Sequence, residues 1–133
     1  MKKTILIILF FQQLFLSCDK GTSKVQMKNK TYNFGTLSYG DTLKHKFSIK
    51  NISNVAYLIN DVSTSCGCTN TEYTTSAISK GEFAKVEIEY TPLIEDQGKK
   101  ISKSVVLSDN SENGFQVLRI TGVINREMNE KID

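Results

Sequence analysis

The stretch FAKVEIEYT, residues 83–91, alternates apolar and charged side chains through its centre. One face of an extended chain would carry four apolar side chains, Ala84, Val86, Ile88 and Tyr90. The opposite face would carry Lys85, Glu87 and Glu89 and meet solvent. A period of two residues is that of a β-strand with one face on a core. The stretch therefore predicts a half-buried sheet.

Similar runs recur along the chain, separated by turn residues such as Gly, Asn and Asp. We expect further strands over Thr31–Phe34, Thr42–Asn51, Val55–Ser63, Lys99–Leu107 and Phe115–Ile124. About seven short strands with regular turns are typical of an immunoglobulin-like β-sandwich. The predicted fold class is all-β, with a single sandwich domain over residues 31–124 and a charged tail over 125–133.

The N-terminus follows the plan of an export signal. Lys2 and Lys3 form a basic start, and the apolar run Ile5–Phe11 follows. The small Ser17 directly before Cys18 resembles a bacterial lipobox. That resemblance implies cleavage before Cys18 and attachment of a diacylglycerol to its sulfur. We therefore predict a lipoprotein signal peptide.

The signal peptide would span residues 1–17, and a flexible polar tether would follow the lipidated cysteine over residues 18–30. A transmembrane helix is the first alternative, but the apolar run is well short of the roughly 20 residues that a bilayer span needs. A secretory signal without lipid is the second. The predicted location is the cell envelope, anchored on the periplasmic face or on the cell surface.

The charge balance limits the partners. The chain has 17 Lys and Arg against 14 Asp and Glu, a net charge of +3. Lys2 and Lys3 would leave with the signal, so the mature balance is 15 − 14 = +1. Binding to nucleic acid needs a clustered basic patch, so we expect none. The expected partners are the membrane and a protein of the envelope.

Cys66-Gly67-Cys68 is the one chemically unusual motif. The two thiols could be buried structural groups, since small thiols pack like apolar side chains. They could form a disulfide across one residue, which an oxidising envelope permits. They could also chelate a soft ion such as Cu(I) or Zn(II). His45, the single histidine, falls on the core face of its strand, where it could be a core-edge residue, a third metal ligand or a base for a thiol.

Several motifs resemble a bacterial family catalogued as domain of unknown function 1573. Its front half is matched by Phe34-Gly35, its central signature by Thr64-Ser65-Cys66-Gly67-Cys68-Thr69, and its end by Ile120-Thr121-Gly122-Val123. Its members resemble immunoglobulin-like modules of the Hydin and major-sperm-protein type, and many look like lipoproteins of Bacteroidota. The family often has Pro-Gly where this chain has Lys80-Gly81. The resemblance implies the fold and no established activity.

Two functions follow as hypotheses. The first is a lipid-anchored, non-enzymatic binding or scaffold module of the cell envelope, with no catalytic residues and no cofactor. The alternative is copper binding or disulfide chemistry at Cys66 and Cys68. Cysteine-nucleophile catalysis would need a thiolate, a base and an orienting group, and the sequence offers candidates only for the first two.

Overall fold

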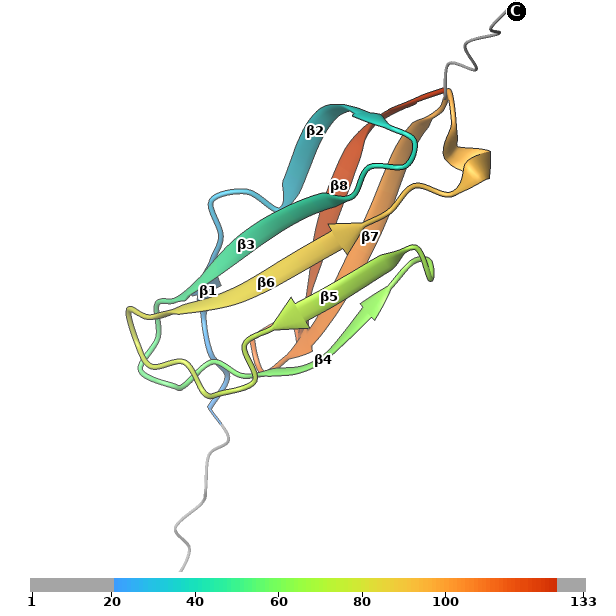
Figure 1. Ribbon diagram of the computed structural model, residues 1–133. Helices are drawn as coiled ribbons and strands as arrows, with labels where there is room; N and C mark the ends of the chain where they lie inside the picture. Colours follow the sequence, from blue (N-terminus) through green and yellow to red (C-terminus); the bar gives the residue numbers. More distant parts are fainter. Residues whose placement is uncertain (1–20, 127–133) are drawn as a thin grey trace, which may run out of the picture.

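The computed structural model describes residues 21–126, which form two sheets facing each other (Figure 1). The strands are β1 (Val25–Gln26), β2 (Thr31–Ser38), β3 (Leu43–Asn51), β4 (Ile59–Thr64), β5 (Thr69–Tyr73), β6 (Phe83–Tyr90), β7 (Lys100–Asp109) and β8 (Phe115–Asn125), with a short 3₁₀ helix, η2 (Ile94–Asp96), before β7. The predicted signal peptide and Cys18 lie outside the described residues, as does most of the predicted tail. Over residues 21–126, no helix is long and apolar enough to cross a membrane.

The two sheets have four strands each. One has the order β1-β3-β6-β5 and the other β2-β8-β7-β4. Every pairing between these eight strands is antiparallel except that of β2, which runs parallel to β8. The predicted immunoglobulin-like β-sandwich is confirmed.

The core lies between the sheets and follows the alternation of the sequence. Ala84, Val86, Ile88 and Tyr90 of β6 are all fully buried. The opposite sheet contributes Val105, Leu107, Leu118, Ile120 and Ile124 to the same cluster. Burial of each large apolar side chain stabilises the fold by about 1.5–3 kcal/mol. On the outer face, Lys44 pairs with Glu89 at 2.8 Å and Lys46 with Glu87 at 2.9 Å.

The predicted tether is wrong from Ser23 onward. Ser23 is fully buried, its N–H donates to the Asn110 carbonyl at 3.0 Å, and its hydroxyl donates to the Asn110 side chain at 2.9 Å. Two residues later β1 pairs with the end of β3. The polar composition of this segment hid its pairing, because an edge strand needs no apolar run. The sandwich therefore begins before Thr31, the predicted boundary.

Two other segments differ from the expected strands. β5 was not predicted, because its residues are mostly polar; its Thr69 is nevertheless buried. The expected strand over residues 55–63 is shorter, since β4 begins only at Ile59. Tyr57 instead exchanges two backbone hydrogen bonds with Ile78, at 2.9 and 2.8 Å.

The sandwich has two distinct ends. The N-terminal pole holds Ser23–Lys24, the loop after β3, the start of β6 and the turn between β7 and β8. The disulfide pole holds the end of β6, η2, the β2–β3 turn and the β4–β5 connection. In Figure 1 the described chain begins at the lower end and finishes at the upper end.

Candidate functional site

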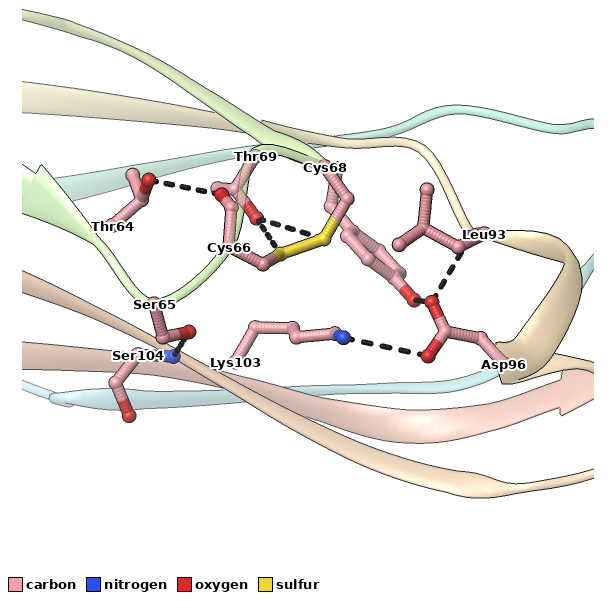
Figure 2. The surroundings of a disulfide bond; sticks show 10 residues. Thr64, Ser65, Cys66, Cys68, Thr69, Leu93, Asp96, Lys103 and Ser104 are labelled. Carbon is pink, nitrogen blue, oxygen red and sulfur yellow. Dashed lines mark hydrogen bonds and ion pairs between the residues drawn. A yellow bond between two sulfur atoms is a disulfide. The ribbon is translucent and has the colours of Figure 1, made fainter.

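A disulfide joins Cys66 and Cys68 in the connection between β4 and β5 (Figure 2). This connection carries the chain from one sheet to the other along an open edge of the sandwich. Backbone bonds fix it to both sheets: Ser65 N–H donates to the Ser104 carbonyl of β7 at 3.0 Å, and Thr91 N–H donates to the Cys68 carbonyl at 3.1 Å. Gly67 between the cysteines is exposed. The disulfide therefore lies in a braced turn.

The sulfurs are partly buried and have a hydroxyl beside them. The hydroxyl oxygen of Thr69 lies 3.6 Å from the sulfur of Cys66 and 3.9 Å from that of Cys68. Thr64 donates its hydroxyl to the Cys66 carbonyl at 3.0 Å. Both cysteines retain some exposed surface, whereas Thr69 is buried. One side of the disulfide is thus held by threonines and another meets solvent.

A buried carboxylate lies at the same pole. Asp96, the last residue of η2, accepts hydrogen bonds of 2.9 Å from the Tyr90 hydroxyl and from the Leu93 N–H. Its other oxygen lies 3.4 Å from the Lys103 ammonium. Figure 2 shows the Lys103 side chain extending past the disulfide toward Asp96. The carboxylate thereby joins the end of β6, the 3₁₀ turn and β7.

These contacts determine the titration of the cluster. Burial alone would raise the pKa of Asp96, but the hydrogen bonds from Leu93 and Tyr90 and the charge of Lys103 outweigh it and lower that pKa. The pKa of the Tyr90 hydroxyl is raised, mostly by burial and to a smaller extent by the hydrogen bond to Asp96. Asp96 is thus an anion and Tyr90 a neutral donor at neutral pH.

The turn held by Asp96 presents two neighbouring apolar side chains to solvent. Leu93 is 40% exposed and Ile94 is 70% exposed, the largest exposure among the large apolar residues described. No sequence motif indicated a role for these two residues or for Asp96. The sequence does contain a signal for this exposed pair. Two apolar residues directly follow Pro92, whereas a turn between strands is ordinarily polar.

The structure does not bring His45 to the cysteines. His45 lies on β3, and β6 separates that strand from β5 and the disulfide. Its ring stacks on Tyr32, with the ring centroids 3.6 Å apart, and meets the edge of Phe47 at 4.7 Å. Burial lowers the pKa of His45. These contacts are those of a core-edge histidine.

The structure bears on all three alternatives for the cysteine motif. The structure holds the pair as a disulfide, so neither sulfur is a free thiol or a metal ligand in this state. Within residues 21–126, no group of three or more His, Cys, Asp or Glu side chains could hold a metal ion. The chemistry that this arrangement supports is reduction of the disulfide and thiol–disulfide exchange.

A family model described as "Protein of unknown function (DUF1573)" matches residues 25–124. No curated protein sequence matches the chain. Among solved structures, a protein of unknown function from Porphyromonas gingivalis superposes with a TM-score of 0.67 at 16% identity, covering 78% of this chain and 48% of that one. This chain thus spans about half the length of the Porphyromonas protein.

Two further structures show the same fold. The seventh PapD-like domain of human CEP192 gives a TM-score of 0.62 at 12% identity, with 80% of this chain and 88% of that chain covered. A family 123 glycoside hydrolase from Clostridium perfringens gives 0.59 at 11% identity, with 79% and 27% covered. At such identities the likeness is one of fold alone.

Proposed function

Because this chain belongs to the DUF1573 family, whose description states no activity, we propose a function from the surface of this chain itself. The protein is a lipid-anchored, non-enzymatic immunoglobulin-like domain of the cell envelope that binds another protein. The predicted lipobox at Cys18 supports the anchor. The exposed pair Leu93 and Ile94 at the disulfide pole is the observation that supports binding.

The pair is suited to recognition because it is both apolar and fixed. The Leu93 N–H donates to Asp96, and Asp96 is held in turn by Tyr90 and Lys103. A fixed turn loses little conformational freedom on binding, which favours affinity. Apolar anchors that become fully buried carry much of the energy of protein interfaces. We therefore place the partner at this pole.

A photo-crosslinking amino acid at position 94, in the full-length protein in intact cells, tests the binding surface. Val106 on β7 is 38% exposed and provides a matched position away from the pole. We expect a reproducible protein adduct from position 94 and none from position 106. Equal labelling from both positions, or none from either, would contradict the proposal.

The anchor has its own test. Each buried methylene contributes about 0.8 kcal/mol, and two acyl chains hold a protein on a membrane stably. A Cys18→Ala variant should therefore move to the soluble fraction after export. If it stays with the membrane, the anchor is not a lipid on Cys18.

The second candidate function is thiol–disulfide exchange at Cys66 and Cys68, favoured by their partly exposed disulfide. A thiolate of a dithiol donor would attack one sulfur and form a mixed disulfide, and the second donor thiol would then release the reduced pair and leave the donor oxidised. The loop closed by the disulfide has only three residues. Its entropic stabilisation is thus roughly 1.6 kcal/mol, below the value of about 3 kcal/mol for a 15-residue loop.

Equilibration in redox buffers, followed by alkylation and mass measurement, tests this candidate. Structural disulfides of secreted proteins have reduction potentials below about −300 mV. A Cys66–Cys68 potential clearly above that value supports exchange chemistry. A potential below it leaves the disulfide a structural brace.

A further inference from the structure

We propose that the N-terminal pole of the sandwich rests on the lipid bilayer and that the disulfide pole points away from it. The inference builds on the anchor at Cys18 in the proposed function. It adds a surface of the domain itself, defined by the exposed apolar residues Ile52, Phe83 and Phe115 together with Lys24 and Lys80.

The link between the anchor and the fold is short. Ser23 is fixed in the fold by its hydrogen bonds to Asn110, and the Lys24 carbonyl accepts from Ile52 N–H at 2.9 Å. Five residue steps separate Cys18 from Ser23. A fully extended chain spans at most about 3.6 Å per residue, so the link reaches at most about 18 Å. The N-terminal pole is therefore confined to the vicinity of the headgroups.

Three large apolar side chains are exposed at this pole. Ile52 is 46% exposed in the loop after β3, and Phe83 and Phe115 are 51% and 53% exposed at the starts of β6 and β8. Figure 1 shows that these elements reach the end of the sandwich where the described chain begins. Aromatic and branched aliphatic side chains are those that enter the headgroup and acyl boundary.

Lysines lie at the same pole as these apolar side chains. Lys24 and Lys80 are exposed at this pole, and the Lys50 ammonium lies 5.7 Å from the centre of the Phe83 ring. Lysines beside apolar side chains fit a bilayer with anionic headgroups, where each basic residue adds attraction within a Debye length. Glu82, Glu112 and Asp61 are exposed acids at the same end, and Asp61 lies opposite Ser108, the residue that pairs with Phe115.

Tethering explains why a modest surface is sufficient. A lipid on Cys18 would keep the pole near the bilayer, so the second contact becomes intramolecular and is favoured by a high effective concentration. The 11 residues of β8 run between the poles and extend about 37 Å at 3.4 Å per residue. This orientation holds the disulfide, Leu93 and Ile94 tens of ångströms from the lipid.

Single-tryptophan fluorescence tests the orientation, because the chain contains no tryptophan. Ile52→Trp reports on the N-terminal pole and Ile94→Trp on the disulfide pole; both positions are exposed, so neither change disturbs the core. Each full-length variant is processed in a bacterial host and reconstituted into phosphatidylethanolamine–phosphatidylglycerol vesicles. The quencher is a spin label on the lipid acyl chains.

For Ile52→Trp we expect a blue-shifted emission that the spin label on the acyl chains quenches. For Ile94→Trp we expect the unquenched emission of a tryptophan in water. Phe115→Trp should behave like Ile52→Trp. If the protein floats with the vesicles and all three tryptophans remain unquenched, the orientation is wrong while the anchor stands. If the protein does not float, the anchor fails and the orientation fails with it.

A longer link provides the matched control. Inserting 20 Gly and Ser residues between Thr22 and Ser23 leaves both poles unchanged but weakens the confinement of the domain. The quenching of Ile52→Trp should then decrease while flotation persists. If the quenching of both Ile52→Trp and Ile94→Trp is unchanged after the insertion, the short link to Cys18 does not orient the domain.

Discussion

The hydroxyl of Tyr90 donates a hydrogen bond of 2.9 Å to the carboxylate of Asp96, and both groups are buried. This bond connects the last residue of β6 to the last residue of η2. It fixes the turn that presents Leu93 and Ile94. The proposed recognition surface therefore depends on a polar contact between two buried side chains.

Removal of either partner should destabilise the domain. We expect Tyr90→Phe to cost about 1 kcal/mol in free energy of unfolding, because one hydrogen bond is lost. Asp96→Ala should cost about 2–3 kcal/mol, since the buried Tyr90 hydroxyl and the partly buried Leu93 N–H lose their acceptor. Denaturant unfolding at pH 7 measures both values. Equal stability of Asp96→Ala and the parent protein would contradict the assigned contacts.

The same carboxylate predicts a pH dependence. The pKa of Asp96 is lower in the fold than its unfolded value of about 3.9. Its contribution is thus fully present above the unfolded pKa and is lost as the pH falls through the folded pKa. The stability difference between the parent and Asp96→Ala should be constant from pH 7 to pH 5 and shrink below about pH 4. A difference that is the same at pH 3 and pH 6 would be inconsistent with this titration.

His45 should titrate below the ordinary histidine range. Burial lowers its pKa, so the fold favours the neutral ring stacked on Tyr32. Below the unfolded pKa of about 6.5, the unfolded chain takes up the proton first, and stability falls as the pH drops toward the folded pKa. As the single histidine, its ring protons can be followed without ambiguity by NMR. A midpoint at or above 6.5 in the folded protein would rule this out.

Any side chain at Gly122 should destabilise the domain while Phe34 is in place. A Cβ at Gly122 would overlap the ring of Phe34, which lies on the neighbouring strand β2. We expect Gly122→Ala to cost about 1–3 kcal/mol, and less in a Phe34→Leu background. Gly67→Ala is the control, because a Cβ there meets no atom within 4 Å. Additive effects of the two substitutions would show that they are not in contact.

The disulfide should contribute little to global stability. The entropic model for a three-residue loop gives roughly 1.6 kcal/mol, so a Cys66→Ser, Cys68→Ser double variant should fold and lose about that much. Thermal unfolding with and without reductant compares the stability of the reduced protein with that of the disulfide-bonded protein. Failure of the reduced protein to fold would instead assign the disulfide a structural role.

Alternation along β6 and β3 was sufficient to predict the sandwich, because one buried face requires a period of two. The same reasoning missed β5, whose side chains Asn70 and Glu72 face solvent at a sheet edge. Its Thr69, Thr71 and Tyr73 have the branched and aromatic character that favours strands, and that signal was available. β1 was too short to show any period.

The site was less accessible to sequence reasoning. The Cys66-Gly67-Cys68 motif marked its place, but the sequence left the thiol, disulfide and metal alternatives open. Asp96 looks like an ordinary charged turn residue, because its burial depends on Tyr90 six residues earlier and on Lys103 from another sheet. The distance of His45 from the cysteines depends on strand order, which alternation does not specify.

An intact mass of the full-length protein, purified from membranes in detergent without reductant, tests the anchor and the disulfide together. We expect the mass of residues 18–133 plus a lipid on Cys18, lower by two hydrogens for the Cys66–Cys68 disulfide. Reduction should restore those two hydrogens and leave the lipid in place. An unlipidated chain, or one that carries both thiols free, would show that the protein is not a lipid-anchored domain with this disulfide.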